Sequence, residues 1–259
     1  MLKAVLFDLD GTLIDTPGVI VETAQAVLRA LGRGRPELAA VHPTERATNS
    51  SRRAGDYADR LPADPEAIRA TIGLPLPLAF AQLLGGDPAS AAVLDAVERY
   101  RVLWRAEVSP RIAQLVYPGA LEGVRALHGR GLQLAVVTGK AQSGADATVD
   151  AAGLRPFFHF VGGYDLVPRP KPHPDLALLA LERLGAAAED AVVVGDAAID
   201  VLMARAAGVR SIAVTYGAQS EKVLRSAGPT WVAHSVAEMF ALLGGSALDG
   251  ATALRPLPS

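Results

Sequence analysis

The chain has 259 residues, with 25 basic and 27 acidic side chains and no cysteine. This length suffices for one large or two small domains with a full hydrophobic core. The balanced charge argues against nucleic acid or an anionic membrane as a partner, and the lack of cysteine excludes disulfides, thiolate catalysis and cysteine-ligated zinc. The N-terminal apolar run stops at Asp8, too early for a signal peptide, and no segment approaches the roughly 20 apolar residues of a membrane helix. We therefore expect a cytoplasmic globular protein.

The first predicted element is a buried strand at 3–7, "KAVLF", and a region of different character follows it. Helices are predicted at 19–32 and 89–108, and nothing between them resembles a buried strand. The segment 33–65 is polar and rich in Arg and Pro, so we expect it to be mobile or partly disordered. The simplest interpretation is a helical module, residues 17–115, inserted after the first strand.

From residue 116 the chain alternates short apolar runs with helical stretches, such as 119–130 and 172–185. The runs end in Gly or a polar residue, which is typical of parallel strands covered on both faces. We predict an α/β fold, a doubly wound, Rossmann-like parallel sheet formed by 1–16 and 116–245, with 246–259 as a frayed tail. The predicted strands of this part are 132–139, 157–163, 191–196, 211–217 and 230–235. Glycines stand where helices should end, at Gly131, Gly153, Gly185 and Gly208.

Two carboxylates, Asp8 and Asp10, come directly after the first strand, and Gly11 and Thr12 open a tight turn after them. Residues two apart on a strand point to the same side, so these acids can face one space. Neighbouring carboxylates repel each other, and a hard cation such as Mg²⁺ would allow both to stay ionised. Taken alone, an Asp-Gly turn with a helix cap explains the stretch equally well.

Polar groups follow another predicted strand in "VVTGK". Thr138 offers a hydroxyl and Gly139 an unobstructed backbone N–H close to a predicted helix start, which suits a phosphate oxygen. A threonine N-cap accounts for this short motif equally well.

A lysine and two further acids follow the remaining strands. Lys171 lies between prolines at a predicted helix start, where a cation is unfavourable, so an anionic partner should compensate its charge. Asp196 follows a buried strand and is placed to bind a metal, with Asp200 one helical turn later as its indirect partner. The alternative is that both acids cap the helix.

In order and residue type, "DLDGTLID", "VVTGK", "KPHP" and "VVVGDAAID" resemble the four motifs of the haloacid dehalogenase superfamily, over about residues 3–240. The chain looks most like the branch of phosphoglycolate phosphatases and β-phosphoglucomutases, which carry a helical cap after the first motif. The resemblance implies that Asp8 attacks phosphorus and that Asp10 acts as general acid and base. It also implies Mg²⁺ as cofactor. The metal ligands would be Asp8, the backbone carbonyl of Asp10, and Asp196. The phosphoryl oxygens would be held by Thr138, Gly139 and Lys171. The site would be supported by Gly11, Thr12, Asp15 and Asp200.

Two positions depart from relatives and bear on function. β-Phosphoglucomutases typically have His where this chain has Ile20, and many relatives have Asn where it has Gly139. We therefore expect a Mg²⁺-dependent phosphatase that acts on a small phosphorylated metabolite, with phosphoglycolate, a sugar phosphate and a biosynthetic intermediate as the candidates. A phosphosugar mutase and a non-catalytic binding protein with the same fold are the alternatives. The sequence indicates neither the substrate nor the oligomeric state.

Overall fold

The computed structural model describes residues 1–34 and 64–245. The predicted mobile segment 33–65 falls almost entirely outside these ranges, and the predicted tail 246–259 falls wholly outside them. None of the helices in the described ranges combines the length and apolar composition that crossing a bilayer requires.

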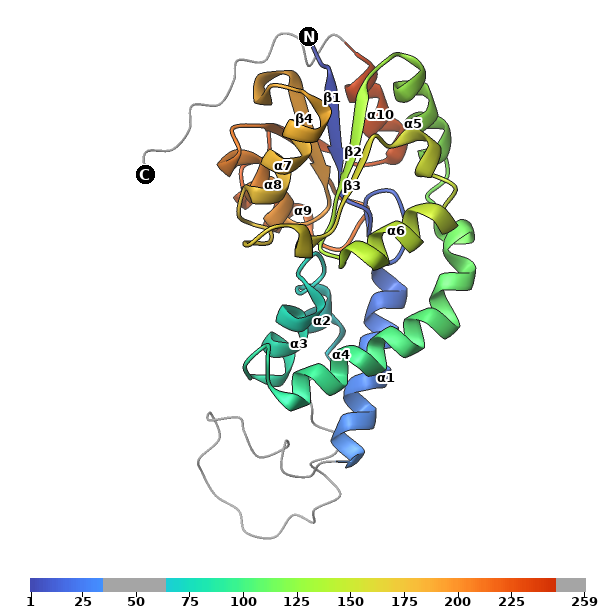
Figure 1. Cartoon of the computed structure of the whole chain (residues 1–259), viewed down its shortest axis with the longest axis vertical. Helices are drawn as coiled ribbons and strands as arrows, with labels where there is room; N and C mark the ends of the chain where they lie inside the picture. The colour runs from blue at the N-terminus through green and yellow to red at the C-terminus, as the bar shows by residue number, and fades with distance from the viewer. Residues whose placement is uncertain (35–63, 246–259) are drawn as a thin grey trace. The chain divides into compact units, whose positions relative to one another are not determined.

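The described residues form a six-stranded sheet with the order β3-β2-β1-β4-β5-β6. Figure 1 labels its strands β1 to β4. All neighbouring strands run parallel, so their carboxyl ends share one edge of the sheet. The predicted α/β fold with a parallel sheet is confirmed. The strands are β1 Ala4–Phe7, β2 Gln133–Val137, β3 Phe160–Gly162, β4 Ala191–Gly195, β5 Arg210–Val214 and β6 Trp231–Ala233.

Helices cover both faces of the sheet because its strands are apolar on both sides. In β1, Ala4 and Leu6 belong to the core that packs against helices α7 and α8. Phe7 points to the opposite face, where its ring lies 6.3 Å from that of Phe240 in α10. The helices of this part are α5 Ala120–Gly129, α6 Gln142–Ala151, α7 Asp175–Leu184, α8 Ala198–Ala206, α9 Glu221–Ser226 and α10 Val236–Gly244.

The predicted glycine stops are confirmed by the backbone after each helix. Gly131, Gly153, Gly185 and Gly208 all have positive φ, between 61° and 82°. Glycine adopts this left-handed conformation without the steric cost that a Cβ atom brings.

Several predicted elements are shorter than the sequence pattern suggested, and for two of them prolines give the reason. The strand predicted at 157–163 is formed only by Phe160–Gly162, because Arg155–Phe157 make a 3₁₀ turn and Pro156 cannot donate to a strand ladder. The helix predicted at 172–185 begins at Asp175, after the last proline of the motif.

The chain divides into two compact units. One comprises residues 1–17, 73–75 and the chain from 109 onward, and the other comprises 18–72 and 76–108. The prediction had placed 73–75 and 109–115 in the inserted module, whereas their contacts are with the sheet-containing unit. The remaining helices are α1 Pro17–Gly34, α2 Pro65–Arg69, α3 Leu76–Leu84 and α4 Ala91–Leu103, followed by a π-helical turn at Trp104–Val108 and a 3₁₀ segment at Ser109–Leu115.

The second unit has an aromatic core of its own. Tyr100 in α4 is buried, its ring lies 5.9 Å from that of Phe80 in α3, and it stacks on Trp104 at 5.7 Å. The rings of Phe80, Tyr100 and Trp104 thus pack against one another inside this unit.

Candidate active site

Three buried carboxylates meet at the carboxyl edge of the sheet. Asp8 follows β1, Asp196 follows the neighbouring strand β4, and Asp200 lies in the first turn of α8. One oxygen from each side chain lies within 4.8 Å of the others. The parallel register, which pairs Phe7 with Val194, brings the ends of β1 and β4 level, so the predicted convergence of these acids is observed.

Lys171 is the cation of this cluster. Its Nζ donates to Oδ1 of Asp8 at 3.0 Å and to Oδ1 of Asp200 at 2.6 Å, and the residue is 2% exposed. Burial alone would lower the pKa of Lys171, but the two carboxylates outweigh it and the pKa lies above its ordinary value. The predicted anionic partner is therefore confirmed, and two carboxylates share that role.

Asp200 makes two sets of contacts, and one of them, the helix cap, is an alternative that the sequence left open. Its Oδ1 accepts from Lys171, while its Oδ2 accepts from the backbone N–H of Ala197 at 3.1 Å, just before α8 begins. It thus caps the helix and also fixes the lysine. Gly195 makes this possible, because a Cβ atom there would overlap the Asp200 side chain.

The cluster carries more negative than positive charge. Three carboxylates face one ammonium group, and burial disfavours their ionised forms. Burial raises the pKa of Asp8 to about 7, with Lys171 opposing the shift and Asp200 and Asp10 adding to it. Burial, followed by the charges of Asp8 and Asp200, also raises the pKa of Asp196 well above its ordinary value. A divalent cation bound to these carboxylates would favour their ionised forms and so oppose both shifts.

Asp196 provides an independent test of whether a cation fits. Its Oδ2 accepts from the backbone N–H of Ala218 at 2.6 Å, but its Oδ1 is buried and has no hydrogen-bond partner among the described residues. Glycines line this carboxylate: a Cβ atom at Gly11, which has φ +75°, or at Gly217 would overlap Asp196. An unsatisfied carboxylate oxygen beside two other carboxylates is the donor set that Mg²⁺ prefers, so these residues fit the ion.

Asp10 lies in a different environment from the three clustered acids. Its Oδ1 accepts from the hydroxyl of Thr16 at 2.7 Å, and its Oδ2 lies 3.0 Å from Nζ of Lys140. Its carboxylate thus faces the loop after β2, and Asp200 takes its place as the third carboxylate of the cluster. This separation gives Asp8 and Asp10 different surroundings, as two different chemical roles require.

The loop after β2 carries Thr138, Gly139 and Lys140. Thr138 is buried, continues the strand ladder through its N–H to Gly162, and accepts from the N–H of Lys140 at 3.3 Å. The alternative of a threonine N-cap is wrong, because α6 begins only at Gln142. The N–H of Gln142 itself donates to Asp165 at 2.7 Å, so an acidic side chain occupies the helix start that was expected to suit phosphate.

The remaining supporting residues lie in the turn after β1. The Thr12 hydroxyl is buried without a partner among the described residues, and its carbonyl accepts from the Tyr216 hydroxyl at 3.0 Å. Asp15 is exposed and accepts from the Tyr117 hydroxyl at 3.2 Å, away from the acid cluster. These contacts tie the turn to the segments after β5 and before α5.

Sequence reasoning missed several participants. Lys140 stood in the quoted "VVTGK" motif without a role, and Thr16 directly follows the acidic turn, so both had a positional signal. Gly217 and the N–H of Ala218 had none, because their value comes only from the close approach of their backbone to Asp196.

Comparisons with known proteins agree with this geometry. The haloacid dehalogenase-like hydrolase family matches residues 2–208. A Dickeya dadantii (strain 3937) protein named probable phosphatase IndB is 40% identical over 239 residues, 92% of each chain. A phosphoglycolate phosphatase of Pseudomonas fluorescens (strain Pf0-1) is 27% identical over 232 residues, 89% of this chain and 75% of its own.

A solved structure supports the same relationship. A haloacid dehalogenase-like family hydrolase of Streptococcus pneumoniae is similar with a TM-score of 0.69 and 26% identity, covering 93% of this chain and 98% of the other. Together with the phosphatase relatives, the family match makes the chain a phosphoric monoester hydrolase. The protein belongs to the haloacid dehalogenase-like hydrolase family, in its phosphoglycolate phosphatase and β-phosphoglucomutase-like branch.

Proposed function

We propose that this hydrolase is a Mg²⁺-dependent phosphatase that cleaves a small phosphomonoester through a phospho-Asp8 intermediate. The observation that carries the proposal is the position of Asp8: it is buried, held by Lys171, and grouped with Asp196 and Asp200, while Asp10 lies apart. A cysteine-free chain acting on a small metabolite fits the cytoplasm, and we propose that location.

In the first step a carboxylate oxygen of Asp8 attacks phosphorus, and the bond between phosphorus and the ester oxygen breaks. Asp10 gives its proton to the leaving alcohol. Lys171 fixes the other oxygen of Asp8, so the nucleophile approaches in one orientation. The Thr138 hydroxyl hydrogen and the Gly139 N–H donate to the phosphoryl oxygens, whose charge is redistributed in the transition state.

In the second step Asp10 takes a proton from water, which attacks phosphorus and breaks the bond to Asp8. Phosphate leaves and Asp8 returns as a carboxylate. Asp8, Asp196 and the backbone carbonyl of Asp10 would hold Mg²⁺, which when bound supplies positive charge next to the transferred group. Thr16 and Lys140 keep the Asp10 carboxylate on its own side of the site between steps.

The helical unit, residues 18–72 and 76–108, is proposed to act as a cap that supplies most substrate contacts, as in the family branch that the sequence resembles. Phosphoglycolate, a sugar phosphate and a biosynthetic intermediate remain the substrate candidates. In a mutase the phosphoryl group would move to another position of a phosphosugar without release of phosphate. Ile20, in place of the histidine typical of β-phosphoglucomutases, favours the phosphatase.

Substitution of Asp8 by Asn tests the proposal, with p-nitrophenyl phosphate as substrate and Mg²⁺ in excess. We expect Asp8→Asn to abolish turnover while circular dichroism shows a folded protein. The matched control is Asp190→Asn, which precedes β4 at the far end of the sheet and contacts Lys3; it should keep full activity. Undiminished turnover by Asp8→Asn would refute the phospho-Asp8 intermediate. Transfer within a phosphosugar without free phosphate would favour the mutase.

A further inference from the structure

β3 is an edge strand of the sheet, and its outer side needs hydrogen-bond partners. Gly162 faces β2, because its carbonyl accepts from the N–H of Thr138 at 3.0 Å. Successive residues of a strand direct their backbone groups to opposite sides, so Val161 and Gly163 direct theirs away from β2. An edge of this kind is normally paired or covered in native proteins.

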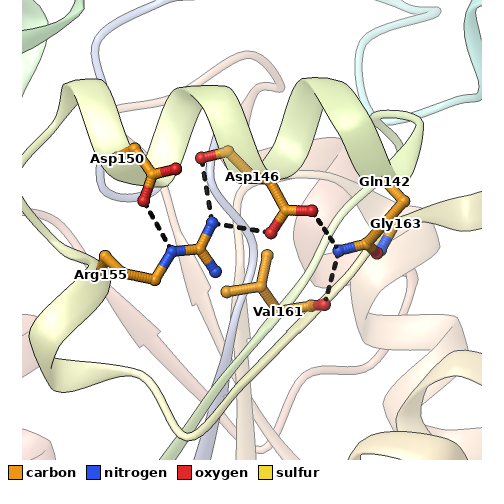
Figure 2. Close-up of polar contacts among 6 residues, drawn as sticks. All are labelled: Gln142, Asp146, Asp150, Arg155, Val161 and Gly163. Atoms are coloured by element: carbon orange, nitrogen blue, oxygen red, sulfur yellow. Dashed lines mark hydrogen bonds and ion pairs between the residues drawn. The ribbon is translucent and has the colours of Figure 1, made fainter.

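The side chain of Gln142 pairs this edge. Its Nε2 donates to the Val161 carbonyl at 3.0 Å, and its Oε1 accepts from the Gly163 N–H at 2.7 Å (Figure 2). A residue of a neighbouring parallel strand would make the same two bonds on either side of Gly162. The carboxamide therefore takes the place of the backbone N–H and C=O of one residue of an additional strand.

A third contact, to Asp146, holds the carboxamide in this orientation. The second hydrogen of Nε2 points to Asp146 at 2.9 Å, and Arg155 binds Asp146 at 2.7 Å and Asp150 at 2.7 Å (Figure 2). All donors of the Gln142 amide are thus used, and its orientation is fixed by three different partners.

The position of Gln142 in the chain links this edge to the proposed site. Gln142 is the first residue of α6 and directly follows the 138–141 loop, which carries Thr138, Gly139 and Lys140. The loop also contacts the segment that follows β3, because the Tyr164 N–H donates to the Lys140 carbonyl at 2.9 Å. Gly163 lets the backbones touch, since a Cβ atom there would overlap Gln142 and Ala141.

We propose that Gln142 is a positioning residue of the phosphatase reaction. By pairing the outer edge of β3 it fixes the loop that presents Thr138 and Gly139 to the phosphoryl group and Lys140 to Asp10. The inference rests on the proposed function. Displacement of such groups by about 1 Å can cost on the order of 100-fold in rate. A displaced loop should therefore lower kcat/KM even at temperatures where the protein stays fully folded.

The test compares Gln142→Met, which keeps the side chain's length without its hydrogen bonds, with Arg155→Gln. Arg155→Gln removes the ion pairs to Asp146 and Asp150. None of the three Gln142 contacts involves Arg155, which binds Oδ1 of Asp146 whereas Gln142 binds Oδ2. We measure Tm, kcat and KM for p-nitrophenyl phosphate, and inhibition by vanadate, well below both melting temperatures. Gln142→Met should lose about tenfold or more in kcat/KM and bind vanadate correspondingly more weakly. Arg155→Gln should lower Tm but stay within about twofold of wild type in both kinetic readouts.

Equal kinetics for Gln142→Met and wild type, with only Tm lowered, would overturn the proposal, as would an equal kinetic loss in Arg155→Gln. If Gln142→Met does not fold, Gln142→Glu replaces it, because it keeps the acceptor for Gly163 and removes the donor to Val161. The same loss of kcat/KM and of vanadate binding is expected, and its absence counts against the proposal. Failure of the proposed function is recognised separately, by an inactive wild type or an active Asp8→Asn.

Discussion

Nζ of Lys140 lies 3.0 Å from Oδ2 of Asp10, and this ion pair joins the loop after β2 to the turn after β1. Both side chains are mostly buried, with 16% and 12% of their surfaces exposed. Partial burial strengthens an ion pair relative to one in water, and the Thr16 hydroxyl occupies the other oxygen of Asp10. The proposed acid and base is therefore held at two points by residues that have no part in the acid cluster.

Replacement of Lys140 by Met should lower kcat, because the Asp10 carboxylate loses one of the two contacts that orient it. We expect a loss of about tenfold or more, with partial recovery in Lys140→Arg, which restores the charge with different geometry. Steady-state kinetics with p-nitrophenyl phosphate and an alkyl phosphate measure the effect. A kcat unchanged in Lys140→Met for both substrates would show that the contact does not orient Asp10 for catalysis.

The stabilisation that Mg²⁺ provides should increase with pH. Burial raises the pKa of Asp8 from 3.8 to about 7, so between these values the folded, metal-free chain holds a proton that the unfolded chain has released. The metal-free protein therefore becomes less stable as pH rises through this window. Mg²⁺ binds the ionised carboxylates and removes that penalty, so the Tm increase on adding Mg²⁺ should be small near pH 4 and grow up to and beyond pH 7.

Thermal unfolding with Mg²⁺ or with a chelator, across that pH range, measures this dependence. Asp196→Asn is the informative variant, because it removes a proposed ligand and should abolish most of the Tm increase. The same increase at every pH, or an undiminished one in Asp196→Asn, would contradict the assignment of the ion to this cluster.

Lys171 should contribute more to stability than any surface lysine with a comparable ion pair. Lys171→Met leaves three buried carboxylates without their cation, a change of a kind that costs about 3–5 kcal/mol. Lys3 has an equally short contact, 2.6 Å to Asp190, but lies exposed at the surface. Denaturant unfolding of the metal-free proteins at neutral pH should therefore show a large loss for Lys171→Met and little change for Lys3→Met. Similar values for the two variants would mean that the buried carboxylates simply take up protons when the lysine is removed.

The convergence of Asp8 and Asp196 could be predicted because their strands are marked by unbroken apolar runs. Such runs identify buried parallel strands, and parallel strands bring their carboxyl ends to one edge. The family resemblance supplied the proposed roles of these residues. Asp200 followed from its spacing, one turn into a helix that begins just after Asp196.

Contacts between loops could not be predicted in this way. The ion pair of Lys140 with Asp10 links residues 130 positions apart, and the hydrogen bond from Ala218 to Asp196 depends on the direction of one backbone N–H. Both are set by how two loops pack, for which neither periodicity nor residue type gives a signal. The short β3 was overestimated for a related reason, since its apolar run begins at Phe157, the last residue of the 3₁₀ turn that Arg155 anchors to α6.

Gly139 should tolerate no side chain. A Cβ atom on Gly139 would overlap the carbonyl of Gly73, which belongs to the same compact unit, and Gly73 itself has φ +96° and little room beside Ile199. Gly139→Ala must therefore displace one of the two backbones. We expect lower Tm and a loss of about tenfold or more in kcat/KM for p-nitrophenyl phosphate, since Thr138 and Lys140 move with the loop.

Gly144, five residues further along, is the matched control because the same added methyl group meets nothing closer than 3.9 Å, the Cβ of Lys140. It lies inside α6, where alanine is more favourable than glycine by roughly 0.5–1 kcal/mol. Gly144→Ala should therefore raise Tm and leave kcat/KM unchanged. If Gly139→Ala behaved like Gly144→Ala in both measurements, the 73–75 segment would have to yield without disturbing the site. The close contact between Gly73 and Gly139 would then not explain why this chain has glycine at position 139.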